Sequence, residues 1–178
     1  MSKQGNIIEV TGITKSFTDG DAVTQVLKGI DLIVKEGEFV AIMGRSGAGK
    51  STFLYQMSLL DTPTSGSIRL DGKVIDSMST TEKTKFRLHI LGYVFQDYSL
   101  LPELTALENI MVPLLMQGIS TKQAKKRSEE VLASVNLLNR AGNLPSELSG
   151  GEQQRVSIAR AITHKPKIIF ADEPTANL

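Results

Sequence analysis

The order of apolar and polar positions along the chain predicts a mixed α/β protein. Imperfect alternation over residues 7–13 and 26–34 predicts two strands near the start. The unbroken apolar run at residues 39–43 is typical of a buried parallel strand. Further along, the pattern predicts helices at 51–60 and 80–89, strands at 67–70 and 92–95, and a hairpin turn at Asp71-Gly72.

The second half of the chain has a helical pattern and then returns to a strand. Between residues 105 and 135 the apolar positions recur on one helical face. Ser149 is expected to cap a further helix, with Glu152 three residues later as in a capping box. That helix is expected to end near His164, before a last apolar strand at 167–171. The order of elements predicts one α/β domain with a helical segment inserted into a β-rich core.

Composition narrows the possible functions. The 178 residues suffice for one substantial core, and 40% hydrophobic with 22% charged residues is ordinary for a globular domain. A net charge of +1, 5% aromatic residues and no Trp argue against a nucleic-acid partner. Without cysteine, disulfides and cysteine metal sites are excluded. No apolar window reaches the roughly eighteen residues of a membrane span, so we expect no membrane-embedded segment.

Residues 44–51 carry the clearest chemical signal. They read Gly-Arg-Ser-Gly-Ala-Gly-Lys-Ser and match the phosphate-binding pattern G-x-x-x-x-G-K-[ST]. The glycines let backbone N–H groups surround phosphate oxygens, and the start of the next helix adds its partial positive charge. Lys50 would reach the β- and γ-phosphates, and the Ser51 hydroxyl would ligate Mg²⁺. The predicted phosphate site is Gly44, Arg45, Ser46, Gly47, Ala48, Gly49, Lys50, Ser51 and Thr52.

Two acids follow the last predicted strand. Asp172 ends the apolar run 167–171, where a carboxylate can hold Mg²⁺ through water. Glu173 would point the other way, and we predict it to be the general base, or the positioner, of an attacking water. Alone, the pair reads equally well as two solvated acids at a strand end. The phosphate loop upstream favours the functional interpretation.

A second glycine motif, Leu148-Ser149-Gly150-Gly151-Glu152, opens the later helix. A helix N-terminus of this kind binds anions, although a plain serine-capped helix is the alternative interpretation. One ATP does not need two phosphate cradles on one subunit. We therefore predict that a second copy of the chain supplies this motif across a dimer interface.

The phosphate loop at 44–51, Gln96, the motif at 148–152 and the acidic strand end at 168–173 follow one another along the chain. In this order they resemble the nucleotide-binding domain of ABC transporters, and the resemblance covers essentially the whole chain. Residues 94–109 are similar to the branch with lipoprotein-release, macrolide-export and cell-division ATPases. The resemblance implies a P-loop NTPase core of mostly parallel sheet with flanking helices, an N-terminal antiparallel β region and a helical subdomain. It implies ATP and Mg²⁺ as cofactors.

The resemblance also assigns roles to single residues. Phe17 would stack on adenine, with a core aromatic as the alternative. Gln96 would touch Mg²⁺ or the attacking water, and Ser149 and Gly151 would contact the partner's γ-phosphate. Membrane permease subunits would dock near Gln96–Glu103. The protein would thus be cytoplasmic and peripheral on the inner face of the membrane.

The chain departs from the family pattern in two places. Glu152 stands where the best-known signature has Gln, and the family expects an Asp directly after Leu178 and a switch His further on. His89 and His164 do not stand in that position. We therefore expect a C-terminally truncated domain that binds ATP but barely hydrolyses it. Its core would be residues 1–96 and 165–178, and its helical subdomain 97–164.

Other functions explain less of the sequence. A soluble ABC-type ATPase of DNA repair or translation typically carries long coiled coils or two cassettes, and this chain has one cassette without sustained heptads. A non-hydrolytic nucleotide sensor stays open if the truncation is natural. A generic P-loop kinase leaves residues 148–152 unexplained.

Overall fold

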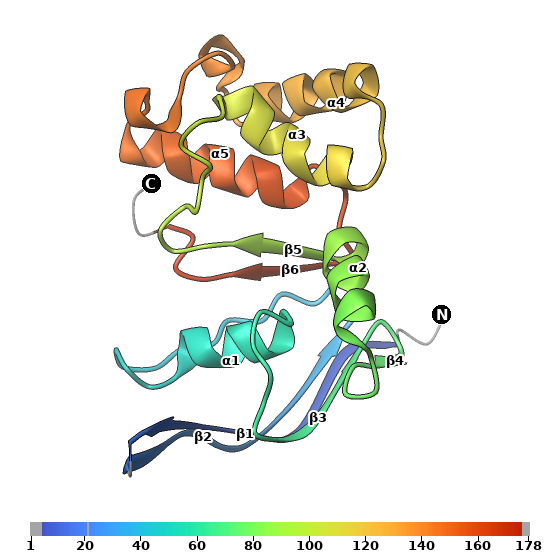
Figure 1. Cartoon of the computed structure of the whole chain (residues 1–178), viewed down its shortest axis with the longest axis vertical. Helices are drawn as coiled ribbons and strands as arrows, with labels where there is room; N and C mark the ends of the chain where they lie inside the picture. Colours follow the sequence, from blue (N-terminus) through green and yellow to red (C-terminus); the bar gives the residue numbers. More distant parts are fainter. Residues whose placement is uncertain (1–4, 21, 176–178) are drawn as a thin grey trace. The chain divides into compact units, whose positions relative to one another are not determined.

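The computed structural model describes residues 5–20 and 22–175. The chain divides into two compact units, Met1–Lys85 and Phe86–Leu178. Figure 1 shows the helices and strands of each unit.

The first unit is built on a four-stranded antiparallel sheet of order β2-β1-β3-β4. Its strands are β1 (Asn6–Asp19), β2 (Ala22–Lys35), β3 (Ser65–Leu70) and β4 (Lys73–Val74). The first two strands are longer than the alternation predicted, because bulges in their pairing let the ladder continue past breaks in the pattern. Helix α1 (Lys50–Met57) belongs to the same unit. Most of its buried apolar residues come from β1, β2, β3 and α1, and two more lie in the segments between elements: Ile8, Val10, Ile13, Leu27, Val34, Phe53, Met57, Ile68 and Leu70, with Leu59 and Ile75.

The predicted hairpin turn at Asp71-Gly72 is confirmed. Both residues adopt a left-handed backbone, with φ of 48° and 73°, and they join β3 to β4. Two consecutive positive φ angles give the turn a twist that matches the strands it connects.

The predicted strand at residues 39–43 is wrong. No residue in the described part of the chain pairs with this segment in a strand ladder, and Phe39 is 95% and Met43 89% exposed. An apolar run indicates only that burial is favourable, whereas a strand also needs a neighbour that completes its hydrogen bonds. The segment runs as irregular backbone directly into the glycine-rich loop.

Helix α2 (Thr80–Ile90) leads into the second unit, whose two strands form a parallel pair. Strand β5 (Leu91–Val94) lies beside β6 (Ile168–Ala171), with Leu91 opposite Ile168 and Val94 opposite Ala171. A side chain on Gly92 would collide with the Ala161 carbonyl, so this strand approaches its neighbouring helix closely only because the residue is glycine.

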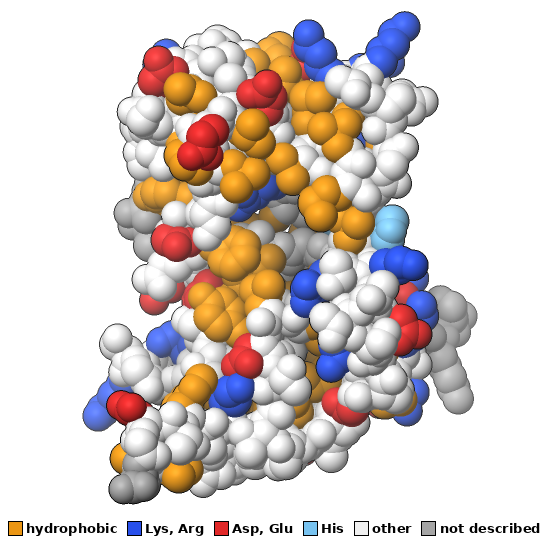
Figure 2. All heavy atoms as spheres, viewed as in Figure 1, with side chains coloured by type: hydrophobic (Ala, Val, Ile, Leu, Met, Phe, Trp, Pro, Cys, Tyr) orange, Lys and Arg blue, Asp and Glu red, His pale blue; other side chains and the backbone are white. Residues whose placement is uncertain are grey.

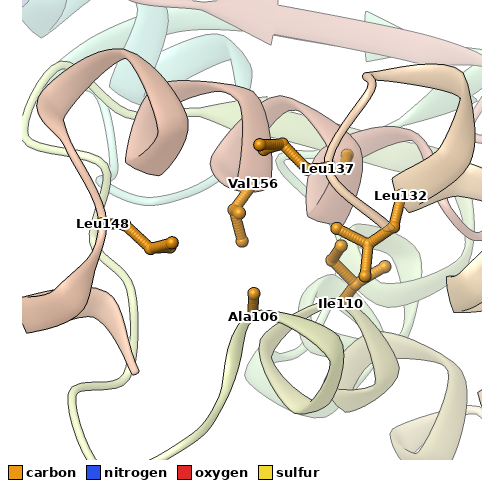
Figure 3. Packing of buried hydrophobic residues seen from close by; sticks show 7 residues of the cluster. Ala106, Ile110, Leu132, Leu137, Leu148 and Val156 are labelled. Carbon is orange, nitrogen blue, oxygen red and sulfur yellow. The ribbon is translucent and has the colours of Figure 1, made fainter. Parts of the chain in front are cut away.

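Three longer helices complete the second unit: α3 (Ala106–Met116), α4 (Thr121–Ser134) and α5 (Gly150–Ile162). Two short 3₁₀ turns, η1 (Leu138–Arg140) and η2 (Pro145–Glu147), lie between α4 and α5. Figure 3 shows apolar side chains from these elements pointing toward one another. The core cluster consists of Ala106, Ile110, Leu132, Leu137, Leu148, Val156 and Ala159.

The surface carries charge of both signs. On the face seen in Figure 2, Lys and Arg side chains are interspersed with Asp and Glu side chains. Among the residues that the structure describes, no helix combines the length and apolar character that crossing a membrane requires.

Candidate functional site: a phosphate loop and an acidic strand end

The glycine-rich loop of the first unit folds back on its own lysine. Gly47 and Gly49 have φ of 75° and 86°, in the left-handed region that favours glycine. A side chain at Gly49 would also lie 2.9 Å from a valine of β2, so space requires glycine there as well. The Lys50 ammonium donates to the carbonyls of Gly44 at 3.0 Å and Arg45 at 3.1 Å. Its positive charge therefore lies over the first two residues of the loop.

Helix α1 presents free N–H groups at its first turn. Its N-cap is Gly49, which offers no capping side chain, and the turn carries no acidic residue. The N–H groups of Lys50, Ser51 and Thr52 have no acceptor within the helix, and the helix dipole adds partial positive charge. This end of α1 fits a phosphate group by the chemistry of its donors.

Phe17 lies on β1 of the same unit and is 47% exposed. The Lys15 ammonium is 5.1 Å from the centre of its ring, within the range of a cation–π interaction. That ammonium is held in place by Asp61 at 2.7 Å and by the Thr62 carbonyl at 2.8 Å. Adenine stacking on Phe17 stays a prediction.

In the second unit, the predicted catalytic side chains follow the two parallel strands. Gln96 lies two residues after β5, and Asp172 and Glu173 come directly after β6. The Gln96 amide nitrogen Nε2 donates to Glu173 Oε2 at 3.0 Å. Parallel strands in register end at the same edge of the sheet, which brings two residues 77 positions apart into contact.

Asp172 has the character expected of a cation or water ligand. Its N–H donates to the Val94 carbonyl at 3.0 Å, which extends the ladder, and the residue is only 4% exposed. Its carboxylate makes no hydrogen bond or ion pair with any residue in the described part of the chain. A carboxylate at the end of a strand, without a competing partner among the described residues, is of the type that holds Mg²⁺, directly or through water. Glu173 has φ of 46°, so the chain turns left-handed at this point.

No cluster of three or more His, Cys, Asp or Glu side chains able to hold a metal occurs within residues 5–20 and 22–175. The predicted Mg²⁺ ligands are of another type, since Ser51 and Gln96 supply a hydroxyl and an amide and only Asp172 supplies a carboxylate. Ser51 belongs to the first unit, and Gln96 and Asp172 belong to the second.

The loop after Gln96 is fastened to α5 by one arginine. The Arg160 guanidinium donates through Nη1 to the Ser99 carbonyl at 2.6 Å and through Nη2 to the Tyr98 carbonyl at 2.8 Å. Tyr98 and Ser99 both adopt a left-handed backbone, with φ of 61° and 46°. Burial lowers the pKa of Arg160, and the charge of Asp97 opposes that shift. Because an arginine pKa begins far above neutrality, the group stays charged and its hydrogen bonds are charge-assisted.

The capping box at the start of α5 is confirmed. The Glu152 N–H donates to Ser149 Oγ at 3.3 Å, and the Ser149 N–H donates to Glu152 Oε2 at 2.8 Å. A side chain on Gly150 would lie 3.1 Å from the Tyr98 hydroxyl. The first turn of α5 is therefore ordered by local contacts and borders the loop that follows Gln96.

Glu152 has a second partner that the sequence reasoning missed. Arg140, at the end of η1, donates through Nε to Glu152 Oε1 at 3.0 Å. Hydrogen bonds from Ser149, and then the charge of Arg140, hold the pKa of Glu152 below its usual range. The carboxylate is therefore ionised at neutral pH.

Arg140, Arg160 and Lys15 are the residues near the site that the motifs did not indicate. Arg160 had one usable signal: it is four residues after the buried Val156 and next to the buried Ala159, so a charge falls beside the apolar face of α5. Nothing in the local sequence around Lys15 or Arg140 indicated their partners.

The comparisons with known proteins decide the family. The family model of the ABC transporters matches residues 27–176, which is most of the chain. The chain belongs to the ABC transporter family. Its α/β fold and its identity as an ATP-binding, ATPase-type cassette of that family follow.

The similar curated proteins are transporter subunits. This cassette is 49% identical over 173 residues to the lipoprotein-releasing system ATP-binding protein LolD of Zymomonas mobilis, covering 97% of this chain and 75% of that protein. It is 53% identical over 154 residues to LolD of Aquifex aeolicus, covering 86% of this chain and 69% of that protein.

A solved structure agrees with the cassette fold. The dimeric post-hydrolysis state of the ATP-binding cassette MJ0796, bound to ADP and Pi, superposes with a TM-score of 0.92 at 42% identity. The match covers 96% of this chain and 75% of that chain. Like LolD, that protein is longer than the cassette described above.

Proposed function

We propose that this cassette hydrolyses ATP as a homodimer and thereby drives membrane partner subunits. In each half, the phosphate loop of one copy and the residues Ser149, Gly150, Gly151 and Glu152 of the other would bind one ATP. The dimeric state of the similar cassette MJ0796 with ADP and Pi supports this arrangement. The observation that carries the proposal is the contact of Gln96 with Glu173 at the carboxyl ends of the parallel strands.

ATP binding would depend on the positive charge of Lys50 and on the N–H groups at the start of α1. Lys50 and the N–H groups at the start of α1 would hold the β- and γ-phosphates, with backbone N–H groups of residues 44–49 around them. Their present arrangement supports this role, because the Lys50 ammonium needs only to leave two carbonyls to meet phosphate oxygens. Phe17 would stack on the base.

Hydrolysis would rest mainly on positioning. Glu173 would accept a proton from the attacking water, while the Gln96 amide would hold that water and the carboxylate in line. Mg²⁺, held by Ser51, Gln96 and Asp172, would neutralise charge on the phosphates when bound. The place of Asp172 directly after β6, at the same end of the parallel pair as Gln96, supports that assignment.

Membrane subunits would dock beside the loop that follows Gln96, within Gln96–Glu103. Leu101 is 43% exposed, so the loop itself offers apolar surface. Docking here would place the cassette on the inner face of the membrane. We further propose that residues 97–164 act as a helical subdomain of a single cassette whose core is 1–96 and 165–178.

The experiment that tests the proposal compares ATP binding with ATP turnover in Glu173→Gln. The amide keeps the shape of the side chain but cannot accept the proton. We expect the complete protein to lose turnover by at least about a hundredfold and to bind ATP as before. Glu130→Gln, an exposed glutamate on α4, is the matched control and should keep its turnover. Unchanged turnover in Glu173→Gln would refute its role.

A further inference from the structure

The first turn of α5 carries a charge that opposes its proposed ligand. Glu152 is ionised, and its side chain is only 17% exposed. Its Oε2 accepts hydrogen bonds from the Ser149 N–H at 2.8 Å and the Ser149 hydroxyl at 2.9 Å. In the proposed dimer this same turn receives the γ-phosphate of the partner's ATP. A carboxylate beside that phosphate repels it and also competes for the hydroxyl proton of Ser149.

Arg140 is placed to oppose both effects. Its Nε donates to Glu152 Oε1 at 3.0 Å, on the oxygen that Ser149 does not use. The backbone that presents Arg140 is fixed: Leu137 is 2% exposed in the helical core, and the adjacent Ala141 carbonyl accepts from the Leu107 N–H at 3.0 Å. The guanidinium therefore binds the carboxylate and compensates its charge independently of the capping box, which uses the other oxygen.

We propose that Arg140 is a positioning residue for the partner's γ-phosphate and acts through Glu152. With Arg140 in place, the Glu152 carboxylate keeps a partner when the Ser149 hydroxyl turns to donate to phosphate. Without Arg140, the carboxylate retains that hydroxyl and leaves one uncompensated negative charge per binding site. The inference rests on the proposed function, because it assumes that α5 receives the phosphate across a dimer.

Two other roles for Arg140 predict different results. A purely structural role would appear as lower thermal stability of the nucleotide-free protein, and a surface ion pair contributes little to stability. If the guanidinium contacted phosphate directly, Arg140→Gln would weaken the ATP-dependent dimer equally with Glu or Gln at position 152. Only a role through Glu152 makes the effect of Arg140 depend on the carboxylate.

The test is a double-mutant cycle in the complete protein carrying Glu173→Gln, so that ATP persists. The variants are Arg140→Gln, Glu152→Gln and both together, with Lys122→Gln on α4 as the control that removes one exposed positive charge. The dimer dissociation constant is measured by sedimentation equilibrium in ATP, and the melting temperature is measured without nucleotide.

We expect Arg140→Gln to weaken ATP-dependent dimerisation by about tenfold, since each of the two sites loses one compensating charge. In the Glu152→Gln background the same change should cost no more than about twofold. The melting temperature should match that of Lys122→Gln.

Three results would overturn the inference. Arg140→Gln could equal Lys122→Gln, it could cost the same factor in both backgrounds, or its melting temperature could fall enough to explain the weaker dimer. A reference protein that does not dimerise in ATP would instead refute the proposed function, and this inference with it.

Discussion

Replacing Arg160 with methionine should release the loop that follows Gln96 while leaving the rest of the unit folded. Methionine keeps an apolar stem of similar length but has no donors. The two charge-assisted hydrogen bonds to Tyr98 and Ser99 are the ones that disappear. The carbonyls of both residues lie on left-handed backbone, so the bonds now hold a conformation that the chain would not otherwise prefer.

The change in the free energy of the closed loop follows from the two hydrogen bonds and the two left-handed residues. A hydrogen bond to a charged group contributes about 1.5 kcal/mol at the lower end of its range, so the pair contributes about 3 kcal/mol. Two non-glycine residues in the left-handed region cost about 2 kcal/mol together. The observed loop is thus favoured by about 1 kcal/mol with Arg160 and disfavoured by about 2 kcal/mol without it.

Hydrogen exchange followed by mass spectrometry or NMR reads this shift directly. The Leu101 N–H is bonded to Asn109 Oδ1 at 2.8 Å and reports whether the loop is closed. By this balance the open fraction of the loop rises from about 15% to about 97%, so the exchange rate of this N–H rises about sixfold. The matched control is Arg155→Met on the same helix, because no hydrogen bond of the Arg155 side chain occurs among the described residues. Equal exchange in the two variants would refute the idea that Arg160 holds the loop.

Three further predictions concern stability, each measured by urea denaturation. Ser149→Ala removes the side-chain half of the capping box and should lower the free energy of unfolding by about 1 kcal/mol. Ser134→Ala at the end of α4 is the control and should lower it by less. Equal losses in the two variants would contradict the capping role. Ile110→Ala opens a cavity in the fully buried helical cluster and should cost about 2–4 kcal/mol, and a loss below 1 kcal/mol would show that the cluster is not the core of this unit. His164 donates through one ring nitrogen to the Leu91 carbonyl, and burial lowers its pKa. The unfolded chain therefore binds this proton at higher pH than the folded chain, so stability should fall as pH drops from about 6.5 through the lower folded pKa. His164→Gln should flatten that slope, and an unchanged slope would assign it to another group.

The parts of the fold predicted from the sequence are those that local chemistry determines. The turn at Asp71-Gly72 and the capping box of Ser149 and Glu152 each depend on residues at most three apart. The segment at 39–43 failed for the opposite reason. Its apolar character is real, but a strand also needs a partner, and a local pattern does not name one.

The same distinction applies to the site. The phosphate loop could be predicted from its own glycines and lysine. The two acids could be predicted because they stand directly after an apolar strand. The contact of Gln96 with Glu173 depends on which strands pair. The hydrogen bond from Arg160 to the Tyr98 carbonyl joins residues 62 positions apart in the sequence. Such long-range contacts arise from tertiary packing, which brings together residues whose local sequences are unrelated.

Sedimentation of the complete protein carrying Glu173→Gln, with and without ATP and Mg²⁺, shows whether two copies associate around ATP. We expect a monomer without nucleotide, and with ATP and Mg²⁺ a dimer that contains two ATP molecules. Lys50→Ala, which removes the phosphate-loop charge, should prevent that dimer from forming. A protein that binds ATP tightly and yet stays monomeric would contradict the proposed ATP-bound dimer, because the motif at 149–152 would then have no phosphate to bind.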